Sequence, residues 1–115
     1  MPLLKLQLSI ALEEKKKEAL LKSLSKMVAK EIGKPERYVM VLLEESAIII
    51  SGETDPAAFA DIRSIGGLSG SVNKKLSNTL CSLLKENLGI PGDRVYMNFT
   101  DVSASDWGWN GSTFG

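Results

Sequence analysis

The sequence contains an internal repeat, and this repeat leaves few folds open to it. The segment Ile32–Val39 can be aligned with Leu88–Val95, and each contains a glycine followed two residues later by a proline. The two segments lie 56 residues apart, about half of the 115-residue chain. Each follows a stretch with helical spacing of apolar residues and leads into an apolar stretch typical of a strand. The repeat predicts two strand–helix–strand units in a single domain, residues 1–115.

In the first half, leucines alternate with polar residues over residues 4–8, which predicts a half-buried strand. The spacing of apolar residues then predicts a helix from about Glu13 to Ile32 with one buried stripe. Gly33 and Pro35 are suited to end that helix. Residues 38–43 are apolar throughout, which predicts a strand buried on both faces.

The second half shows the same order of predicted elements, but the pattern that indicates its first strand is weaker. Residues 47–50 predict a short apolar strand, and residues 51–71 are rich in glycine, serine and alanine and are interpreted as irregular. A second apolar stripe predicts a helix from about Val72 to Leu88, ended by another glycine and proline. Residues 95–99 predict the last long strand.

Two right-handed units of this kind build one sheet. The predicted fold class is α+β, with a duplicated β-α-β unit, a four-stranded mixed sheet and both helices on one face. The other face then has no cover within the chain, although its strands carry apolar residues. We therefore expect copies of the chain to assemble through that face.

Charge and hydropathy narrow the possible functions. The chain has 14 basic and 14 acidic residues, so its formal net charge is zero, which argues against a nucleic-acid-binding protein. The run Lys15–Lys17 is bordered by glutamates and is interpreted as a solvated helix face. No apolar run approaches the ~20 residues of a membrane span, and the N-terminus lacks a signal-peptide pattern. We expect a cytoplasmic protein that binds neither nucleic acid nor membrane.

The chain has no histidine, which restricts its chemistry further. This excludes Ser-His-Asp and Cys-His catalysis and the commonest zinc ligand sets, and we expect no metal or other cofactor. The α-amino group and the single cysteine, Cys81, are the only groups whose ordinary pKa lies near neutrality. Cys81 lies among leucines on the second predicted helix, which favours a core residue over a nucleophile.

Pro2 is therefore the first candidate for proton transfer. Removal of Met1 would expose a secondary amine, and burial in an apolar pocket or a nearby lysine would lower its pKa. A neutral amine can abstract a proton next to a carbonyl group. Tyr96 and Asn98 lie on one face of the last strand and suit a carbonyl or enolate oxygen, although such a pair is also typical of an exposed face. The stretch 64–71 favours a close-packed turn over a phosphate cradle, because it lacks the P-loop pattern.

Several short motifs, taken together, resemble a known family. They are Pro2, Gly33–Pro35, Tyr38, Ser64–Gly66, Asp93–Phe99 and Gly108–Phe114. This combination resembles the macrophage migration inhibitory factor family of the tautomerase superfamily over essentially the whole chain. The last strand and the C-terminal tail are its most specific parts.

The resemblance implies an architecture and an activity. The architecture is a homotrimer whose sheets form a central barrel, with three pockets at the subunit borders. The activity is keto–enol tautomerisation of phenylpyruvate-like and dopachrome-like substrates, with Pro2 as the general base. The resemblance further implies that Lys34 and the backbone of Ile65 hold the carboxylate of a small aromatic keto acid. The other implied substrate-binding residues are Asn98 and Tyr96, from the neighbouring subunit, and Tyr38, Trp109 and Phe114, on the pocket rim.

The chain departs from the family pattern at two places. Ala57 and Ala60 stand at the positions of a Cys-x-x-Cys motif found in some members, so thiol redox activity is not expected. Trp107 stands where a smaller apolar residue is usual, which suggests a narrower pocket mouth.

Two other functions stay open at this point. One is a cytokine-like ligand, released from cells without a signal peptide, that binds a receptor with little use of the pocket. The other is a trimeric scaffold with a vestigial pocket.

Overall fold

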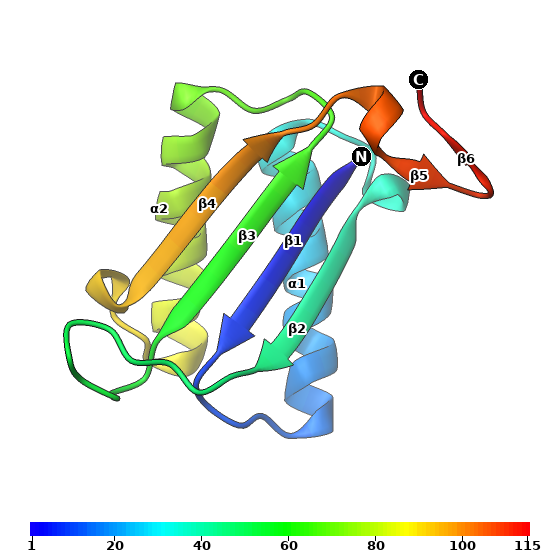
Figure 1. Cartoon of the computed structure of the whole chain (residues 1–115). Coiled ribbons are helices and arrows are strands. Elements are labelled where there is room, and N and C mark those ends of the chain that lie inside the picture. Colours follow the sequence, from blue (N-terminus) through cyan, green and yellow to red (C-terminus); the bar gives the residue numbers. More distant parts are fainter.

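The computed structural model describes all 115 residues and packs two α-helices against a four-stranded sheet (Figure 1). Three 3₁₀ turns and a small C-terminal hairpin complete the chain. The main elements are β1 (Pro2–Leu8), α1 (Glu14–Ile32), β2 (Met40–Glu45), β3 (Ala58–Ser64), α2 (Gly70–Leu88) and β4 (Val95–Asp101). The short elements are η1 (Glu36–Tyr38), η2 (Gly92–Arg94), η3 (Ala104–Asp106), β5 (Gly108–Trp109) and β6 (Ser112–Thr113).

The strands lie in the order β2-β1-β3-β4. β1 is parallel to β2, β3 is parallel to β4, and the two halves meet where β1 runs antiparallel to β3. Both helices lie on the same face of the sheet (Figure 1), so the predicted α+β fold with a duplicated β-α-β unit is confirmed. Lys5 pairs directly with Asp61, its counterpart 56 residues later. A pseudo-twofold axis therefore passes between these two residues.

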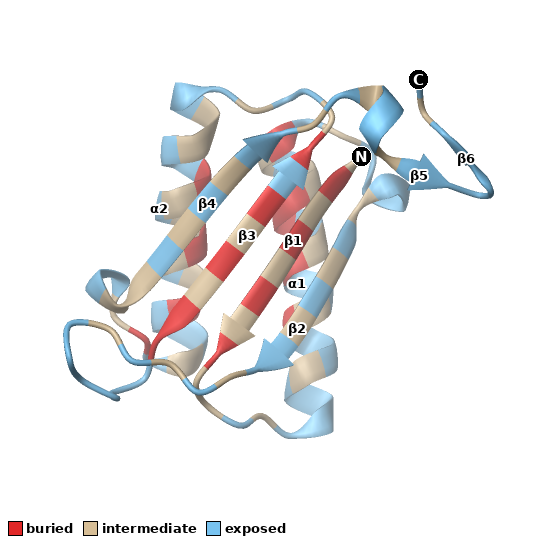
Figure 2. Ribbon diagram, in the orientation of Figure 1, coloured by how far each residue is buried: buried red, intermediate tan, exposed pale blue.

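The core lies between the sheet and the helices. Buried and partly exposed residues alternate along β1 and β3 (Figure 2), as expected for central strands with one covered face. Burial of each large apolar side chain contributes roughly 1.5–3 kcal/mol to stability. The buried apolar side chains of the two central strands are Leu4, Leu6, Leu8, Ala58, Ala60 and Ile62, and the helices add Leu20, Leu24, Met27, Val28, Ile32, Leu76, Leu80 and Leu84.

The helix ends follow the signals in the sequence. Gly33 and Gly89 end the two helices with φ of 76° and 70°, in the left-handed region that glycine adopts without strain. The side chain of Ser69 accepts a hydrogen bond from the Val72 N–H at 3.2 Å and so caps the start of α2. The glycine-rich stretch before α2 is a turn that contains hydrogen bonds of its own, from Ser64 to Gly66 and from Val72 to Ser69. Neither helix has a stretch long and apolar enough to span a bilayer.

The third strand lies later in the chain than the sequence predicts. Residues 47–50 form no strand beyond an isolated bridge between Ile50 and Glu53, and the strand is β3, within the region interpreted as irregular. β3 places small alanines against the core and charged residues on the open face, so its alternation of large apolar residues is weak. Ile49, by contrast, is 67% exposed, so its apolar character does not reflect burial within the chain.

The strand after α1 is an edge strand, and the prediction that it is buried on both faces is wrong. β2 starts at Met40, and Tyr38 belongs to η1. Met40 and Leu42 are 59% and 41% exposed, because they point away from the helices. Val41 and Leu43 alternate with them and pack against the core.

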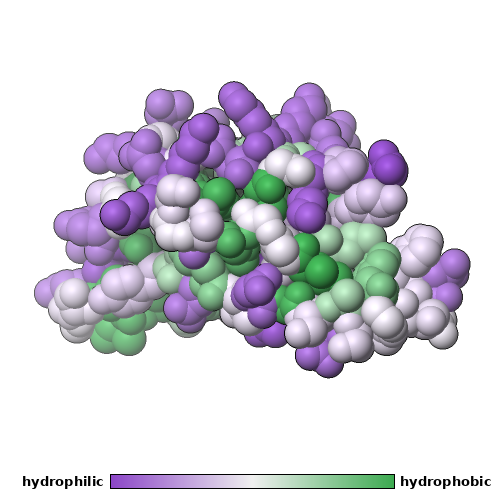
Figure 3. Space-filling model, turned by 90° about the horizontal axis from the view of Figure 1, so that it is seen from above, coloured by the Kyte–Doolittle hydropathy of each residue, from purple (hydrophilic) through white to green (hydrophobic).

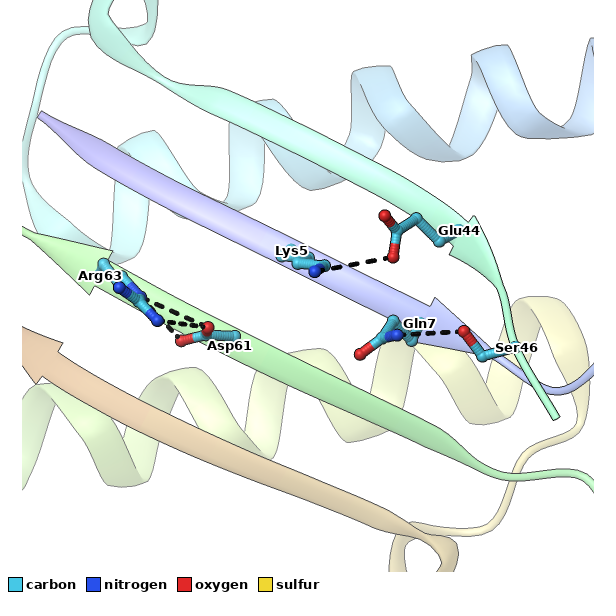
Figure 4. A network of polar contacts seen from close by, with 6 residues as sticks. All are labelled: Lys5, Gln7, Glu44, Ser46, Asp61 and Arg63. Atoms are coloured by element: carbon cyan, nitrogen blue, oxygen red, sulfur yellow. Dashed lines mark hydrogen bonds and ion pairs between the residues drawn. The ribbon is translucent and has the colours of Figure 1, made fainter. Parts of the chain in front are cut away.

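The uncovered sheet face is partly polar. Three pairs of polar side chains interact on it (Figure 4): Lys5 with Glu44, Gln7 with Ser46, and Arg63 with Asp61. Exposed apolar side chains lie on the outer strands, among them Met40, Leu42 and Tyr96. The face is therefore amphipathic, and assembly of copies through it stays a prediction.

Candidate active site at the N-terminal end of the sheet

Pro2 lies at one end of the sheet, where β1 begins and β3 ends. It is fully buried and pairs with Ser64, the last residue of β3. The loop that follows β3 begins there, and the Ile65 N–H donates a hydrogen bond to the Met1 carbonyl at 3.3 Å. The first peptide of the chain is thus held directly against the backbone of residue 65.

The turn after β3 is fixed by further hydrogen bonds. The Ser64 hydroxyl donates to the Gly66 carbonyl at 2.6 Å, which satisfies a buried polar side chain. The Gly66 N–H donates to the Asp101 Oδ1 at 3.1 Å, and the Val102 N–H donates to the Ser64 carbonyl at 2.9 Å. Residues from the end of β4 therefore hold the turn that carries Ile65.

The same turn packs against the end of α1. Gly67 has a φ of 83°, and a Cβ atom built on it would lie 2.7 Å from Ile32 Cγ2 and 3.1 Å from the Ile32 carbonyl oxygen. Only glycine fits this contact without a shift of the helix end. The contact brings Lys34 close, with its Nζ 3.9 Å from the Cβ position at Gly66. Lys34 and Ile65 thus come together although 31 positions separate them in the sequence.

The electrostatics of this cluster favour a neutral amine. The pKa of the Met1 α-amino group is lowered from its ordinary value, mainly because partial burial disfavours the charged form and further because the Lys34 ammonium repels it. Pro2 is more deeply buried than Met1. An amine at residue 2 would experience desolvation in the same direction.

The predicted aromatic residues divide between two places. Trp109 and Phe114 stack within the tail, with ring centroids 5.8 Å apart and an interplanar angle of 16°. Tyr38 lies in η1, where the Arg37 guanidinium sits 4.6 Å from the centre of its ring. The tail follows β4, which ends opposite Ser64, so it starts at the same end of the sheet as Pro2 (Figure 1).

Tyr96 and Asn98 lie away from this cluster. Both are exposed on the edge strand β4, and β3 separates them from β1. Asn98 pairs with Asp61 and thus lies at the level of the middle of β1. One chain therefore brings Pro2, Lys34 and Ile65 together and leaves these two residues apart.

A hollow of about 290 Å³ opens beside this cluster; we call it the Trp107 hollow. Sequence reasoning identified Trp107 but missed two charged residues of the wall, Arg63 and Asp106. The alternation of charged and apolar residues over 60–63 could have revealed Arg63 as a strand residue on an open face. The walls of the hollow are Leu3, Arg63, Val102, Asp106, Trp107 and Gly108.

Figure 3 looks onto this end of the molecule and shows apolar residues gathered across its middle, with hydrophilic residues along one side.

Cys81 lies elsewhere, half-buried on α2. Burial raises the pKa of its thiol, which disfavours the reactive thiolate. No group of three or more carboxylate or cysteine side chains is placed to hold a metal ion.

These observations define a class: an α+β protein with a duplicated β-α-β unit and a basic, partly buried cluster around its first residues. The chain belongs to the macrophage migration inhibitory factor family, whose model, described as "Macrophage migration inhibitory factor", matches residues 1–115. It is 48% identical over 95 residues to a macrophage migration inhibitory factor homolog of Trichuris trichiura, and the alignment covers 82% of this chain and 83% of that protein. It is 41% identical over 98 residues to the macrophage migration inhibitory factor of Rattus norvegicus, over 84% of this chain and 85% of that protein.

Solved structures agree with this assignment. The homologue from Prochlorococcus marinus superimposes with a TM-score of 0.93 at 43% identity, over 98% of this chain and 99% of that one. The macrophage migration inhibitory factor-like protein of Entamoeba histolytica gives a TM-score of 0.93 at 34% identity, over 98% of both chains. The family resemblance of the sequence motifs is confirmed.

Proposed function

We propose that this chain is a keto–enol tautomerase in which the amine of Pro2, freed by removal of Met1, is the general base. Family membership supports tautomerase and cytokine-like functions in general. The finer proposal is that phenylpyruvate-like and dopachrome-like compounds are the substrates. It includes a homotrimer in which Asn98 and Tyr96 of a neighbouring subunit complete the site.

One observation carries this proposal. The Met1 carbonyl accepts a hydrogen bond from the Ile65 N–H beside Lys34, and the terminal amine there has a lowered pKa. An oxygen atom of the chain thus occupies the position proposed for a substrate carboxylate oxygen. Removal of Met1 would free the Ile65 N–H and leave the Pro2 nitrogen as an amine instead of an amide.

The proposed chemistry is a proton transfer between carbon and oxygen. Lys34 and the Ile65 N–H bind the carboxylate of the keto acid and fix its orientation. The neutral Pro2 amine removes a proton from the carbon next to the carbonyl, and the electron pair of that C–H bond forms the enolate. The protonated Pro2 amine then returns the proton to the enolate oxygen, which gives the enol and restores the neutral base. Donors from Asn98 and Tyr96 stabilise the negative charge that develops on the oxygen. Tyr38, Trp109 and Phe114 would border the aryl group.

The test compares three proteins with the same fold. Protein without Met1 should enolise phenylpyruvate, whereas protein that retains Met1 should be inactive because an amide nitrogen is not basic. The Pro2→Gly variant replaces the rigid secondary amine by a flexible primary amine and should lose most of the rate. Because the amine must be neutral, kcat/KM should rise with pH through the pKa of the Pro2 amine and then level off. Full activity of Pro2→Gly or of Met1-retaining protein would overturn the mechanism.

A second candidate function is that of a cytokine-like ligand. It is supported by relatives whose names refer to an effect on macrophage migration. The two functions separate if Pro2 is blocked covalently. If signalling survives the block, the surface of the protein is responsible for receptor binding. If signalling disappears together with tautomerase activity, the site around Pro2 is responsible for both.

A further inference from the structure

The charges of the chain are separated between its two layers. The helices α1 and α2 together contain nine lysines and four glutamates, which gives them a formal charge of +5. The remaining residues contain five basic and ten acidic side chains, a charge of −5. The net charge of zero for the whole chain therefore conceals a basic helix layer. This layer lies behind the sheet (Figure 1), so assembly through the uncovered sheet face would leave it accessible.

Four of these lysines form one row along the outer side of α1, which we call the lysine stripe: Lys15, Lys22, Lys26 and Lys30. In an α-helix these four positions fall within about a quarter turn, opposite Leu24 and Val28, which are fully buried. All four lysines are exposed. At a rise of about 1.5 Å per residue, the stripe is roughly 22 Å long and one lysine wide.

The stripe has almost no acidic partners within the chain. Lys15, Lys26 and Lys30 form no ion pair. Lys22 pairs with Glu18 at 3.3 Å, but the two side chains are 73% and 71% exposed. Surface pairs of this kind contribute little to stability. These four charges therefore stabilise the fold very little.

The second helix shows that the fold does not require these charges. The counterparts of the stripe 56 residues later, on α2, are Ser71, Asn78, Ser82 and Glu86. They are exposed as well, so the equivalent surface is solvated there without a lysine. Solvation of a helix face therefore does not explain the stripe. A row of cations on one helix alone indicates a partner that is anionic and extended.

We propose that the lysine stripe binds a linear sulfated polysaccharide. The two charges are complementary, and a linear chain can follow a row that is one lysine wide. Proteins that bind single-stranded nucleic acid add aromatic side chains for base stacking, and neither helix contains one. Helices that lie on membranes add large apolar side chains, whereas the apolar residues on the outer side of α1 are alanines. The inference goes beyond the proposed function, because the stripe contains no residue of the site around Pro2.

The experiment measures the binding of size-defined heparin oligosaccharides by calorimetry at physiological ionic strength. Lys26→Gln/Lys30→Gln removes two unpaired charges from the stripe and keeps the helix propensity. A lysine close to an anionic surface contributes about fivefold in affinity, so this double variant should bind about 25-fold more weakly. The slope of log Kd against log salt concentration should fall by about one to two units. Lys26→Arg/Lys30→Arg retains both charges and should bind nearly as well as wild type.

Lys74→Gln/Lys85→Gln is the matched control on the neighbouring helix. Both of these lysines are exposed on α2 and form no ion pair, so the variant loses the same charge from the same layer. It should weaken binding less than about threefold, because salt screens charges that lie off the stripe. Thermal unfolding should give the wild-type Tm for both glutamine variants.

Three results would overturn the inference. The first is that wild-type protein binds no heparin at physiological ionic strength, which would make the stripe a solvated surface only. The second is an equal loss of affinity in the two glutamine variants, which would show a response to overall charge. The third concerns other polyanions, tested as phosphatidylserine vesicles and a single-stranded oligothymidylate. If either binds more tightly than heparin and depends on Lys26 and Lys30, the partner is not a polysaccharide.

Discussion

The two ends of the sheet are related by the pseudo-twofold axis, but their side chains differ at the positions that matter. At one end Pro2 and Lys34 surround the start of β1. Their counterparts 56 residues later are Ala58 and Ile90. Ala58 is an internal residue and has no free amine, and Ile90 is fully buried in the core. The repeated backbone thus builds the same corner twice. The end with lysine has a cation at its surface, and at the other end the isoleucine fills the equivalent position with a buried apolar side chain.

A second pair of counterparts shows how the other end is closed. Tyr38, at the end of η1, exposes 40% of its surface. Its counterpart Arg94 donates hydrogen bonds to four backbone carbonyls of the loop before β3, at 2.7–3.4 Å. The guanidinium therefore fixes a loop that has almost no regular structure of its own. The fold therefore supplies two equivalent positions, and a few residues make one of them a candidate site and the other a structural support.

The largest effect is expected when the closed end receives the residue of the open end. Ile90→Lys would bury an unpaired ammonium in the core and should lower the free energy of unfolding by about 3–5 kcal/mol. Urea unfolding measures this loss. Ile90→Leu, which conserves volume, should cost under about 1.5 kcal/mol. A loss below about 1 kcal/mol for the lysine variant would show that the two ends are equally open.

The reverse exchange tests the open end. Lys34→Ile should lower kcat/KM for phenylpyruvate about 10-fold to 100-fold, because a hydrogen bond to a charged group is lost. It should also move the rise of kcat/KM to higher pH. The reason is that the Lys34 charge helps to lower the pKa of the Met1 amine at this end of the sheet. The same repulsion would act on the Pro2 amine, so without it a higher pH is needed for the neutral form.

Lys30→Ile, in the last turn of α1, is the control for a lysine lost from the same region. It should leave both the rate and the pH dependence unchanged. An unchanged pH profile in Lys34→Ile would contradict the assigned role of this lysine.

A smaller effect is expected at the turn that positions Ile65. Gly67→Ala would place a methyl group against Ile32 at a positive φ and should cost about 1–2 kcal/mol of unfolding free energy. Its counterpart in the first half is Ala11, which is exposed, and Ala11→Gly should cost under about 1 kcal/mol. Equal costs from thermal unfolding of the two variants would show that the close contact is absent in solution.

The helices could be predicted from the sequence because each has one apolar stripe and a glycine at its end. β3 could not, because two alanines and a serine fill three of its four buried positions and give little hydrophobic signal. Lys34 and Ile65 were named from the family resemblance, and the turn around Gly67 is what brings them together in space. Arg63 and Asp106 were missed, since their proximity depends on the position of β3 and of the tail. The relation of Asn98 to Pro2 depends on an arrangement between subunits, which no pattern within one chain encodes.

The hydrogen bond from Gly66 to Asp101 makes the amide of residue 65 dependent on the alignment of an edge strand. A slip of β4 by one residue would bring Thr100 or Val102 into the place of Asp101 and remove the carboxylate from the turn. The turn would then lose its anchor while the core between the helices and the two central strands remained. Mispairing of the edge strand would thus displace the Ile65 N–H before it lowered the free energy of unfolding of the whole domain.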